Sequence, residues 1–142
     1  MNTKILDVLG FEQVKSQIGQ YIVTAQGKEA LAKLVPSSDE QVISSWLAET
    51  EDAIKIQRLR GGIPVPKIEN IRPQMKRIEI GADLNGVELA QVARVLSTTQ
   101  ELKRFFADLS ESEIEFSRLY HWEEQLVSLP TLNRRLKEAI EI

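Results

Sequence analysis

Apolar residues recur along the chain at the three- and four-residue spacing that is typical of amphipathic helices. The longest uninterrupted pattern of this kind extends over residues 38–61, where Ile43, Leu47 and Ile54 fall on one face. Neither glycine nor proline interrupts the pattern before Gly61. It therefore predicts one long helix over about 39–60, roughly 33 Å in length at 1.5 Å per residue.

Both ends of this predicted helix carry residues that favour helix termini. Ser38 is expected to be the N-cap, with Gln41 completing the spacing of a capping box. Arg58 and Arg60 lie in the last turn, where positive charge complements the helix dipole. Gly61 then supplies the left-handed residue that commonly ends a helix.

The remaining pattern is also helical. It predicts helices over residues 3–9, 11–23, 25–34, about 71–79 and 85–107, and two or three helices in residues 111–142 with a break near 128–131. Thr24 is a predicted N-cap, and Ser110 with Glu113 has capping-box spacing. Residues 61–67 form the predicted flexible loop. No alternating strand pattern competes, so we expect an all-α, multi-helix bundle in a single domain, 1–142, without a β-sheet.

The pair Asn85-Gly86 allows two interpretations. It could form the turn of a β-hairpin. Alternatively, Asn85 could cap a helix, since Glu88 follows three residues later and the apolar residues beyond it keep helical spacing. The periodicity favours the helix.

Composition narrows the classes of protein to which the chain can belong. Its formal net charge of −3 argues against an extensive basic nucleic-acid surface but leaves room for a local cationic patch. The absence of cysteine excludes disulfides and zinc–thiolate sites. No apolar run reaches the ~20 residues of a membrane span, and the N-terminus lacks a signal-peptide core. We therefore expect a cytoplasmic protein without a membrane partner. Because helical pattern continues to Ile142 without a cap, we also expect it to be a fragment of a longer protein.

Two short motifs suggest chemistry, but neither is complete. Gly27-Lys28-Glu29 resembles part of a phosphate-binding loop, yet it lacks the upstream glycine and the Ser or Thr after the lysine. His121, the only histidine, adjoins glutamates but no remote ligand set, so a half-exposed ring beside Trp122 is expected rather than a metal site. We predict no catalytic, cofactor or metal residue in this chain.

A group of carboxylates, Glu49, Glu51 and Asp52, falls within one turn of the long helix. Paired carboxylates can perform acid–base chemistry or hold a metal. Here Lys55 follows Glu51 at the spacing of a helical ion pair, which favours a solvated helix face.

The candidate nucleic-acid contacts are the cations around the predicted loop, Arg58, Arg60 and Lys67. They would form a local patch for phosphates if the neighbouring helices meet there; the alternative is that they only complement helix ends. Lys76 and Arg77 could extend this patch, and Arg134, Arg135 and Lys137 form a weaker one. The aromatic residues fall at helical spacing and are predicted to be core: Phe105, Phe106, Phe116, Tyr120 and Trp122.

Several motifs, in order and spacing, resemble the start of the core region of MutS-type proteins, in particular the second bacterial branch with a C-terminal Smr domain. The resemblance covers essentially the whole chain. The residues that carry it are Thr24, Gly27-Lys28-Glu29, Leu31, Leu34, Pro36-Ser37, Asp39, Ile43, Leu47, Glu49-Thr50 and Ala53, with Lys4-Ile5-Leu6, Phe11, Ile63-Pro64-Val65, Gly81-Ala82, Leu84 and Glu88-Leu89 fitting the same branch.

This resemblance implies a much larger parent, a DNA-binding ATPase (a hydrolase that uses ATP and Mg²⁺) with a C-terminal endonuclease domain. The ATPase and Smr domains are not in this chain. The family is associated with suppression of homologous recombination and with ribosome rescue, so DNA or the ribosome would be partners of a homodimeric full-length protein. The chain itself would be a non-catalytic scaffold segment. The alternative is a free-standing helical adaptor that binds another protein; a small enzyme has no supporting constellation.

Overall fold

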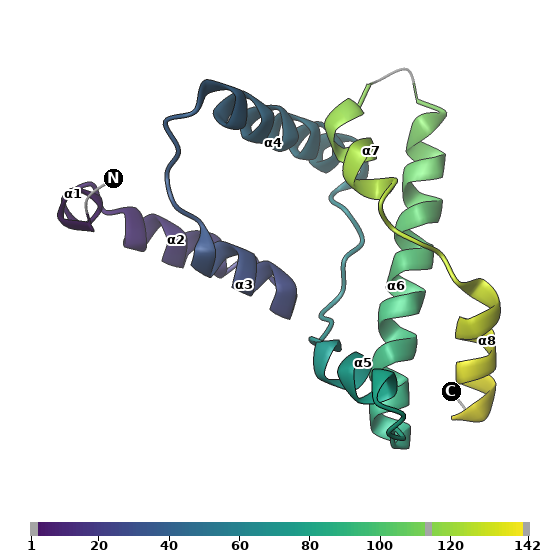
Figure 1. Cartoon of the computed structure of the whole chain (residues 1–142). Helices are drawn as coiled ribbons and strands as arrows, with labels where there is room; N and C mark the ends of the chain where they lie inside the picture. Colours follow the sequence, from purple (N-terminus) through teal and green to yellow (C-terminus); the bar gives the residue numbers. More distant parts are fainter. Residues whose placement is uncertain (1–2, 113–114, 141–142) are drawn as a thin grey trace.

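The computed structural model describes residues 3–112 and 115–140, and all regular secondary structure within these ranges is α-helical (Figure 1). The helices are α1 (Thr3–Val8), α2 (Phe11–Gly19), α3 (Ala25–Lys33), α4 (Glu40–Arg60), α5 (Arg72–Glu79), α6 (Gly86–Ser110), α7 (Ser117–Glu123) and α8 (Pro130–Ala139). The prediction of an all-α fold without a sheet is confirmed for these residues.

Helix α4 matches the predicted long helix, but its N-cap differs by one residue. Asp39, not Ser38, caps the helix, because its carboxylate Oδ1 accepts hydrogen bonds from the backbone N–H of Gln41 (2.9 Å) and Val42 (3.3 Å). Aspartate is as good an N-cap as serine and adds negative charge at the positive end of the dipole. At the other end Gly61 adopts φ 79° and ends the helix as predicted.

Helix α6 starts as the sequence predicted and extends further. Asn85 and Glu88 form the complete reciprocal capping box, so the hairpin interpretation is wrong. With 25 residues it is longer than α4, which has 21. Ser110 is its last residue and donates its hydroxyl to the carbonyl of Ala107, so it is not the predicted N-cap. Glu113, the other half of that predicted box, lies outside the described residues.

Helix α2 is shorter than predicted, since it ends at Gly19 and not near Val23. The backbone N–H groups of Gln20 and Tyr21 bond three residues back, to the carbonyls of Gln17 and Ile18, which tightens and ends the helix. Glycine is a poor helix former, and this one lies beside Leu31 of α3. Apolar periodicity alone therefore predicted the end of this helix too far along the chain.

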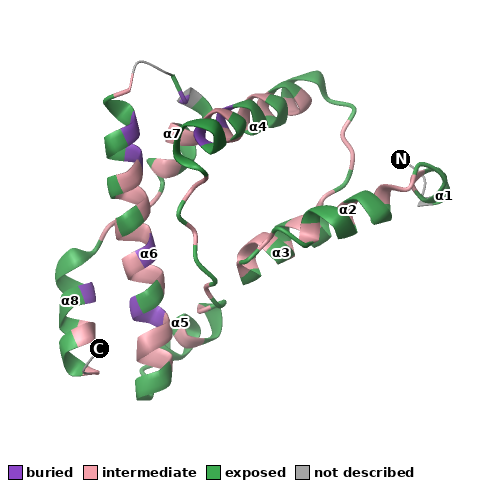
Figure 2. Ribbon diagram, turned by 180° about the vertical axis from the view of Figure 1, so that it is seen from behind, coloured by how far each residue is buried: buried purple, intermediate pink, exposed green. Residues whose placement is uncertain are grey.

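The buried core is small and lies where α4, α6 and α7 meet (Figure 2). It consists of Ile56, Phe106, Leu109 and Phe116, with Ile63, Phe105, Leu119 and Tyr120 packed against it. Three edge-to-face ring pairs, all involving Phe106 or Tyr120, run through this cluster. Trp122 is an exception to the predicted aromatic core, because it remains 54% exposed.

The rest of the molecule is open. Its accessible surface is 10478 Å², whereas a compact monomer of 16.1 kDa exposes about 7,400 Å². In Figure 1, α2 and α3 lie side by side as one arm, α4 ends beside α7, α7 lies next to the upper part of α6, and α8 lies along α6. The excess is about 3,000 Å², and many large apolar side chains of the described chain are 42–84% exposed.

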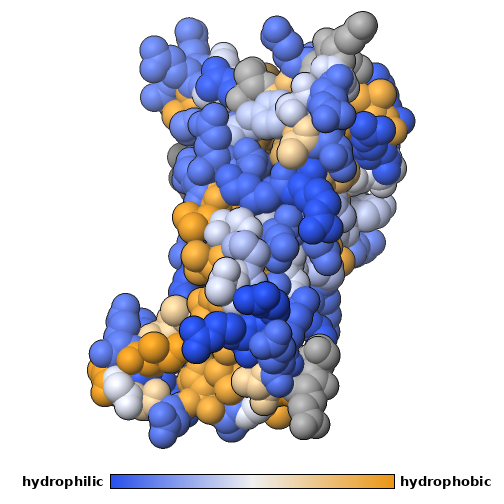
Figure 3. Space-filling view, turned by 90° about the vertical axis from the view of Figure 1, so that its right-hand side faces the viewer, coloured by the Kyte–Doolittle hydropathy of each residue, from blue (hydrophilic) through white to orange (hydrophobic). Residues whose placement is uncertain are grey.

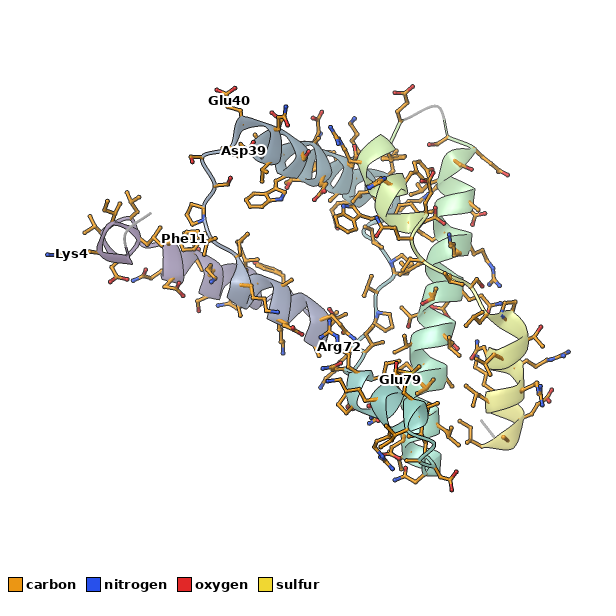
Figure 4. The ribbon with its side chains drawn as sticks, in the orientation of Figure 1. Lys4, Phe11, Asp39, Glu40, Arg72 and Glu79 are labelled. Carbon is orange, nitrogen blue, oxygen red and sulfur yellow. The ribbon has the colours of Figure 1, made fainter. Side chains whose placement is uncertain are left out.

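Polar contacts join the arm formed by α2 and α3 to the segment before α5 and to the first residue of α5. The N–H of Ala25 donates to the carbonyl of Ile68 (3.3 Å), and the amide of Gln26 donates to the carbonyl of Glu69 (3.2 Å). The third contact is an ion pair between Arg72 and Glu29 at 2.7 Å. Figure 4 shows Arg72 at the start of α5, beside the end of α3 from which these contacts come.

Candidate functional site

The predicted nucleic-acid contacts occupy the C-terminal end of α4 and the segment that follows it. Arg58 and Arg60 lie in the last turn of α4, and Lys67 lies in the irregular segment between α4 and α5. All three side chains are exposed, and none has an ion pair or a side-chain hydrogen bond within the described residues. Their charge is therefore available to an external anion.

The geometry groups these three cations only loosely. Positions two residues apart on a helix point to different sides, so Arg58 and Arg60 do not share a face. Lys67 lies seven residues beyond Arg60, on the other side of two glycines with positive φ (79° and 131°). Of the two cations proposed as extensions, Lys76 is exposed, whereas Arg77 is already paired with Glu88 and donates to the carbonyl of Asp83.

The carboxylates of α4 do not form the solvated face that the sequence suggested. Asp52 is buried, and its Oδ2 accepts the backbone N–H of Arg118 (3.0 Å) and of Leu119 (3.2 Å). These N–H groups belong to the first turn of α7, where a helix has no internal acceptors. Asp52 is thus a capping residue supplied by a different helix.

A second carboxylate of the group, Glu49, contacts α7 near the C-terminal end of that helix. Glu49 accepts the indole N–H of Trp122 at 2.8 Å. Only Glu51 behaves as predicted, since it is exposed and lies 3.9 Å from Lys55 in an i,i+4 pair. Lys103 of α6 and Glu123 of α7 form a further ion pair at 3.0 Å. Two of the three predicted carboxylates, Asp52 and Glu49, therefore help to position α7.

A signal for Asp52 is present in the sequence. It lies four residues before Ile56, so both are on the face that enters the core. A carboxylate on an apolar helix face requires a hydrogen-bonding partner when buried. The pattern could have indicated burial, but it could not have identified α7 as the partner.

The Gly27-Lys28-Glu29 motif has a structural role. Gly27 lies in the first turn of α3, and its N–H donates to Oγ1 of the N-cap Thr24 at 2.9 Å. A Cβ at this position would lie 2.7 Å from Cγ2 of Ile22 and 2.8 Å from the same hydroxyl. The glycine is therefore required by the tight entry into the helix.

Glu29 of α3 forms the ion pair that joins α3 to α5, with Arg72, and also pairs with Lys33 of its own helix. Hydrogen bonds from Lys33 and then from Arg72 hold the pKa of this carboxyl below its ordinary value. Glu88 behaves similarly, with a pKa lowered first by the backbone N–H of Asn85 and then by Arg77. Both lowered pKa values follow from the hydrogen bonds and ion pairs that these carboxylates accept.

His121 lies at the C-terminal end of α7, next to Trp122. Its side chain is exposed beside the Trp122 ring, with centroids 6.2 Å apart. Within residues 3–112 and 115–140, no group of three His, Cys, Asp or Glu residues is placed to hold a metal ion. No helix in the same part of the chain is long and apolar enough to cross a membrane.

Helix α8 carries the second group of cations, Arg134, Arg135 and Lys137. It also contains a buried polar residue, Asn133, that the sequence analysis did not identify. Asn133 is 4% exposed, and its amide donates to Ser97 Oγ (3.1 Å) and to Gln100 Oε1 (3.3 Å) of α6. It therefore anchors α8 on α6, while Arg135 is exposed and Arg134 lies 4.0 Å from Glu138.

Comparison with known proteins gives strong matches over nearly the whole chain. No family model matches. Over 141 residues, 99% of this chain, the identity is 65% to a protein of Enterococcus faecalis named Endonuclease MutS2. Proteins of the same name from Latilactobacillus sakei and Levilactobacillus brevis are 46% and 43% identical, again over 99% of the chain. The chain spans only 18% of the length of each of these relatives.

Proposed function

Because the chain matches an N-terminal fragment of MutS2 over 99% of its length, we propose that it is a non-catalytic scaffold segment of a larger DNA-binding ATPase and endonuclease. Its role would be to transmit the state of an ATPase domain to the parts that hold the target. The match to proteins named endonuclease is the observation that carries this proposal.

The open architecture supports the proposal. Relatives extend far beyond the matched 18%, and the described chain exposes about 3,000 Å² more than a compact protein of its mass. A surface of that size, rich in apolar side chains, is costly in water and suits a segment that packs within a larger protein. Asp52 and Gly27, from the two groups that could have performed chemistry, both take part in helix capping.

We further propose that the parent protein acts in suppressing homologous recombination, in rescuing stalled ribosomes, or in both. DNA or the ribosome would be its partner, ATP with Mg²⁺ its cofactor, and a homodimer its working form. These expectations rest on the family resemblance.

Two measurements test the scaffold assignment. The reading frame beyond Ile142 should encode a phosphate-binding (Walker) motif, and the purified 142-residue chain should show neither ATPase nor nuclease turnover. A reading frame that ends near Ile142, or turnover by the purified chain, would contradict the proposal.

The unpaired cations Arg58, Arg60 and Lys67 are the proposed nucleic-acid contacts of this segment. If each neutralises one phosphate of a duplex, the logarithm of the binding constant should fall with the logarithm of salt concentration with a slope of about −2.7. Changing all three to glutamine should remove most of this binding.

The control for that experiment is a triple variant with the same charge change elsewhere, in which Lys28, Arg104 and Arg118 become glutamine. All three are exposed and have no ion pair within the described residues. Equal losses of affinity in the two triple variants would show that net charge, not the proposed patch, determines binding.

One observation favours the alternative of a protein-binding adaptor. Leu47 and Ile54 of α4 are 66% and 45% exposed and lie on the side of the helix opposite to Asp52 and Ile56. Such a strip suits an amphipathic partner helix. The reading-frame test separates the two functions, since an adaptor would be encoded without the ATPase.

A further inference from the structure

Helices α6 and α8 enclose a hollow of about 210 Å³ that is lined by cations from both helices. Arg94 comes from α6 and Lys137 from the last turn of α8. The remaining lining residues are small ones of α6, namely Ala90, Ala93 and Ser97. They recur at i, i+3 and i+7 and therefore form one face of the helix.

The charge of this hollow is unbalanced. Neither Arg94 nor Lys137 has an ion pair or a side-chain hydrogen bond within the described residues. Four other surface hollows of the described chain also contain cations, but each includes a carboxylate among its lining residues: Glu138, Glu69, Glu40 or Glu12. Two unneutralised cations on one hollow repel each other, and a bound anion would relieve that repulsion.

Each of the two cations has an ordinary structural explanation of its own. Those explanations do not account for the presence of both cations on one hollow. Lys137 complements the negative end of the α8 dipole, and an exposed Arg94 would ordinarily be solvated. However, Asn133 anchors α8 on α6 through Ser97 and Gln100, only four residues before Lys137. This anchor holds the two cations on the same hollow.

We propose that this hollow binds a phosphate group between the Arg94 guanidinium and the Lys137 ammonium. Guanidinium and ammonium are the two side-chain groups that proteins use most for phosphate oxygens. Ala90, which is partly exposed, gives the hollow an apolar wall against which a sugar could pack. At about 210 Å³ the hollow is smaller than the ~300 Å³ at which whole-ligand sites begin, so it suits a phosphate with its sugar.

This proposal goes beyond the proposed function, because it concerns α6 and α8 and not the end of α4. Figure 3 views the molecule from the side of α8, where strongly hydrophilic residues adjoin hydrophobic patches. Two further hollows share residues with the site: one of about 620 Å³ shares Lys137, and one of about 210 Å³ shares Arg94 and Ala90. A phosphate held here could therefore be free or part of a longer chain.

The test is a nuclear magnetic resonance titration of the 142-residue chain with inorganic phosphate, adenosine monophosphate, adenosine and a single-stranded 12-nucleotide DNA. We expect saturable shifts of the backbone amides of residues 90–97 and 134–138 with the phosphate-bearing probes, and none with adenosine. Arg94→Gln and Lys137→Gln should each weaken binding about tenfold, whereas Arg94→Lys should retain part of it. Arg104→Gln, which removes an exposed cation of α6 that lies outside every candidate patch, is the matched control.

The probes also identify the source of the phosphate. Tighter binding of the oligonucleotide, with competition by inorganic phosphate, would assign the site to a nucleic-acid backbone; equal affinity would assign it to a free phosphate or monophosphate. Absence of saturable shifts with every probe, or shifts that persist in the Arg94→Gln/Lys137→Gln double variant with unchanged circular dichroism, would overturn the proposal. Because Arg58, Arg60 and Lys67 stay intact in all these variants, the result is independent of the patch at α4.

Discussion

Replacing Asp52 by alanine should destabilise the junction of α4, α6 and α7 more than any other single carboxylate substitution in α4. The side chain is only 6% exposed and accepts two backbone N–H groups, of Arg118 at 3.0 Å and Leu119 at 3.2 Å. Hydrogen bonds between a backbone N–H and a charged group contribute about 1.5–3 kcal/mol each. Alanine would also leave both donors in the part-buried first turn of α7 without an acceptor.

The expected cost of Asp52→Ala is about 2–4 kcal/mol, because two bonds are lost but water regains some access to their donors. Asp52→Asn retains one acceptor oxygen and loses the charge, so we expect about 1 kcal/mol. Urea unfolding followed by near-ultraviolet circular dichroism measures both values. Amide hydrogen exchange at Arg118 and Leu119 reports the local effect directly, and Asp52→Asn provides this measurement if the alanine variant unfolds.

Glu51→Ala is the matched control, since it removes a neighbouring carboxylate whose only partner is Lys55 at 3.9 Å. An exposed helical pair of this kind contributes less than about 0.5 kcal/mol. If Asp52→Ala is no more destabilising than Glu51→Ala, and the Arg118 and Leu119 amides keep their protection, then the inter-helix cap is not a significant source of stability and the reasoning is wrong.

Two further predictions concern α3 and its contacts. Gly27→Ala should destabilise the start of α3 by about 1–3 kcal/mol in thermal unfolding, because the new Cβ has no room, whereas Gly86→Ala at an open helix start should be neutral or slightly stabilising. The contacts of Glu29 should weaken in acid: its folded pKa is lowered, by Lys33 first and Arg72 second, so its contribution is complete above the unfolded pKa and is lost as pH falls through the lower folded value. Side-chain carbon titration by nuclear magnetic resonance should show this depressed pKa and its rise in Arg72→Gln; an unchanged value in that variant would exclude the arginine as a cause.

The helix ends show where sequence reasoning succeeds. Thr24, the Asn85–Glu88 box and Gly61 were identified correctly because caps act within four residues of the chain. Ser38 was wrong by one residue because Asp39 offers the same chemistry next to it. Helix α2 was extended too far because apolar spacing continues past Gly19 although the backbone does not.

The sites show where it fails. Asp52 meets amides 66 and 67 residues away, and no local pattern specifies a partner at that distance. The solvated-face interpretation of Glu49 and Asp52 was wrong for the same reason. Arg94 and Lys137 likewise line one hollow only because Asn133 holds α8 against α6.

The sequence by itself determined the helical class, most helix ends and the family resemblance, since periodicity, capping and motif order are all properties of short stretches of chain. The tertiary structure alone decided which polar residues are buried, which cations remain unpaired and how much surface stays open. These depend on which helices meet, and that is set by a small core between α4, α6 and α7 together with polar contacts between residues distant in the chain.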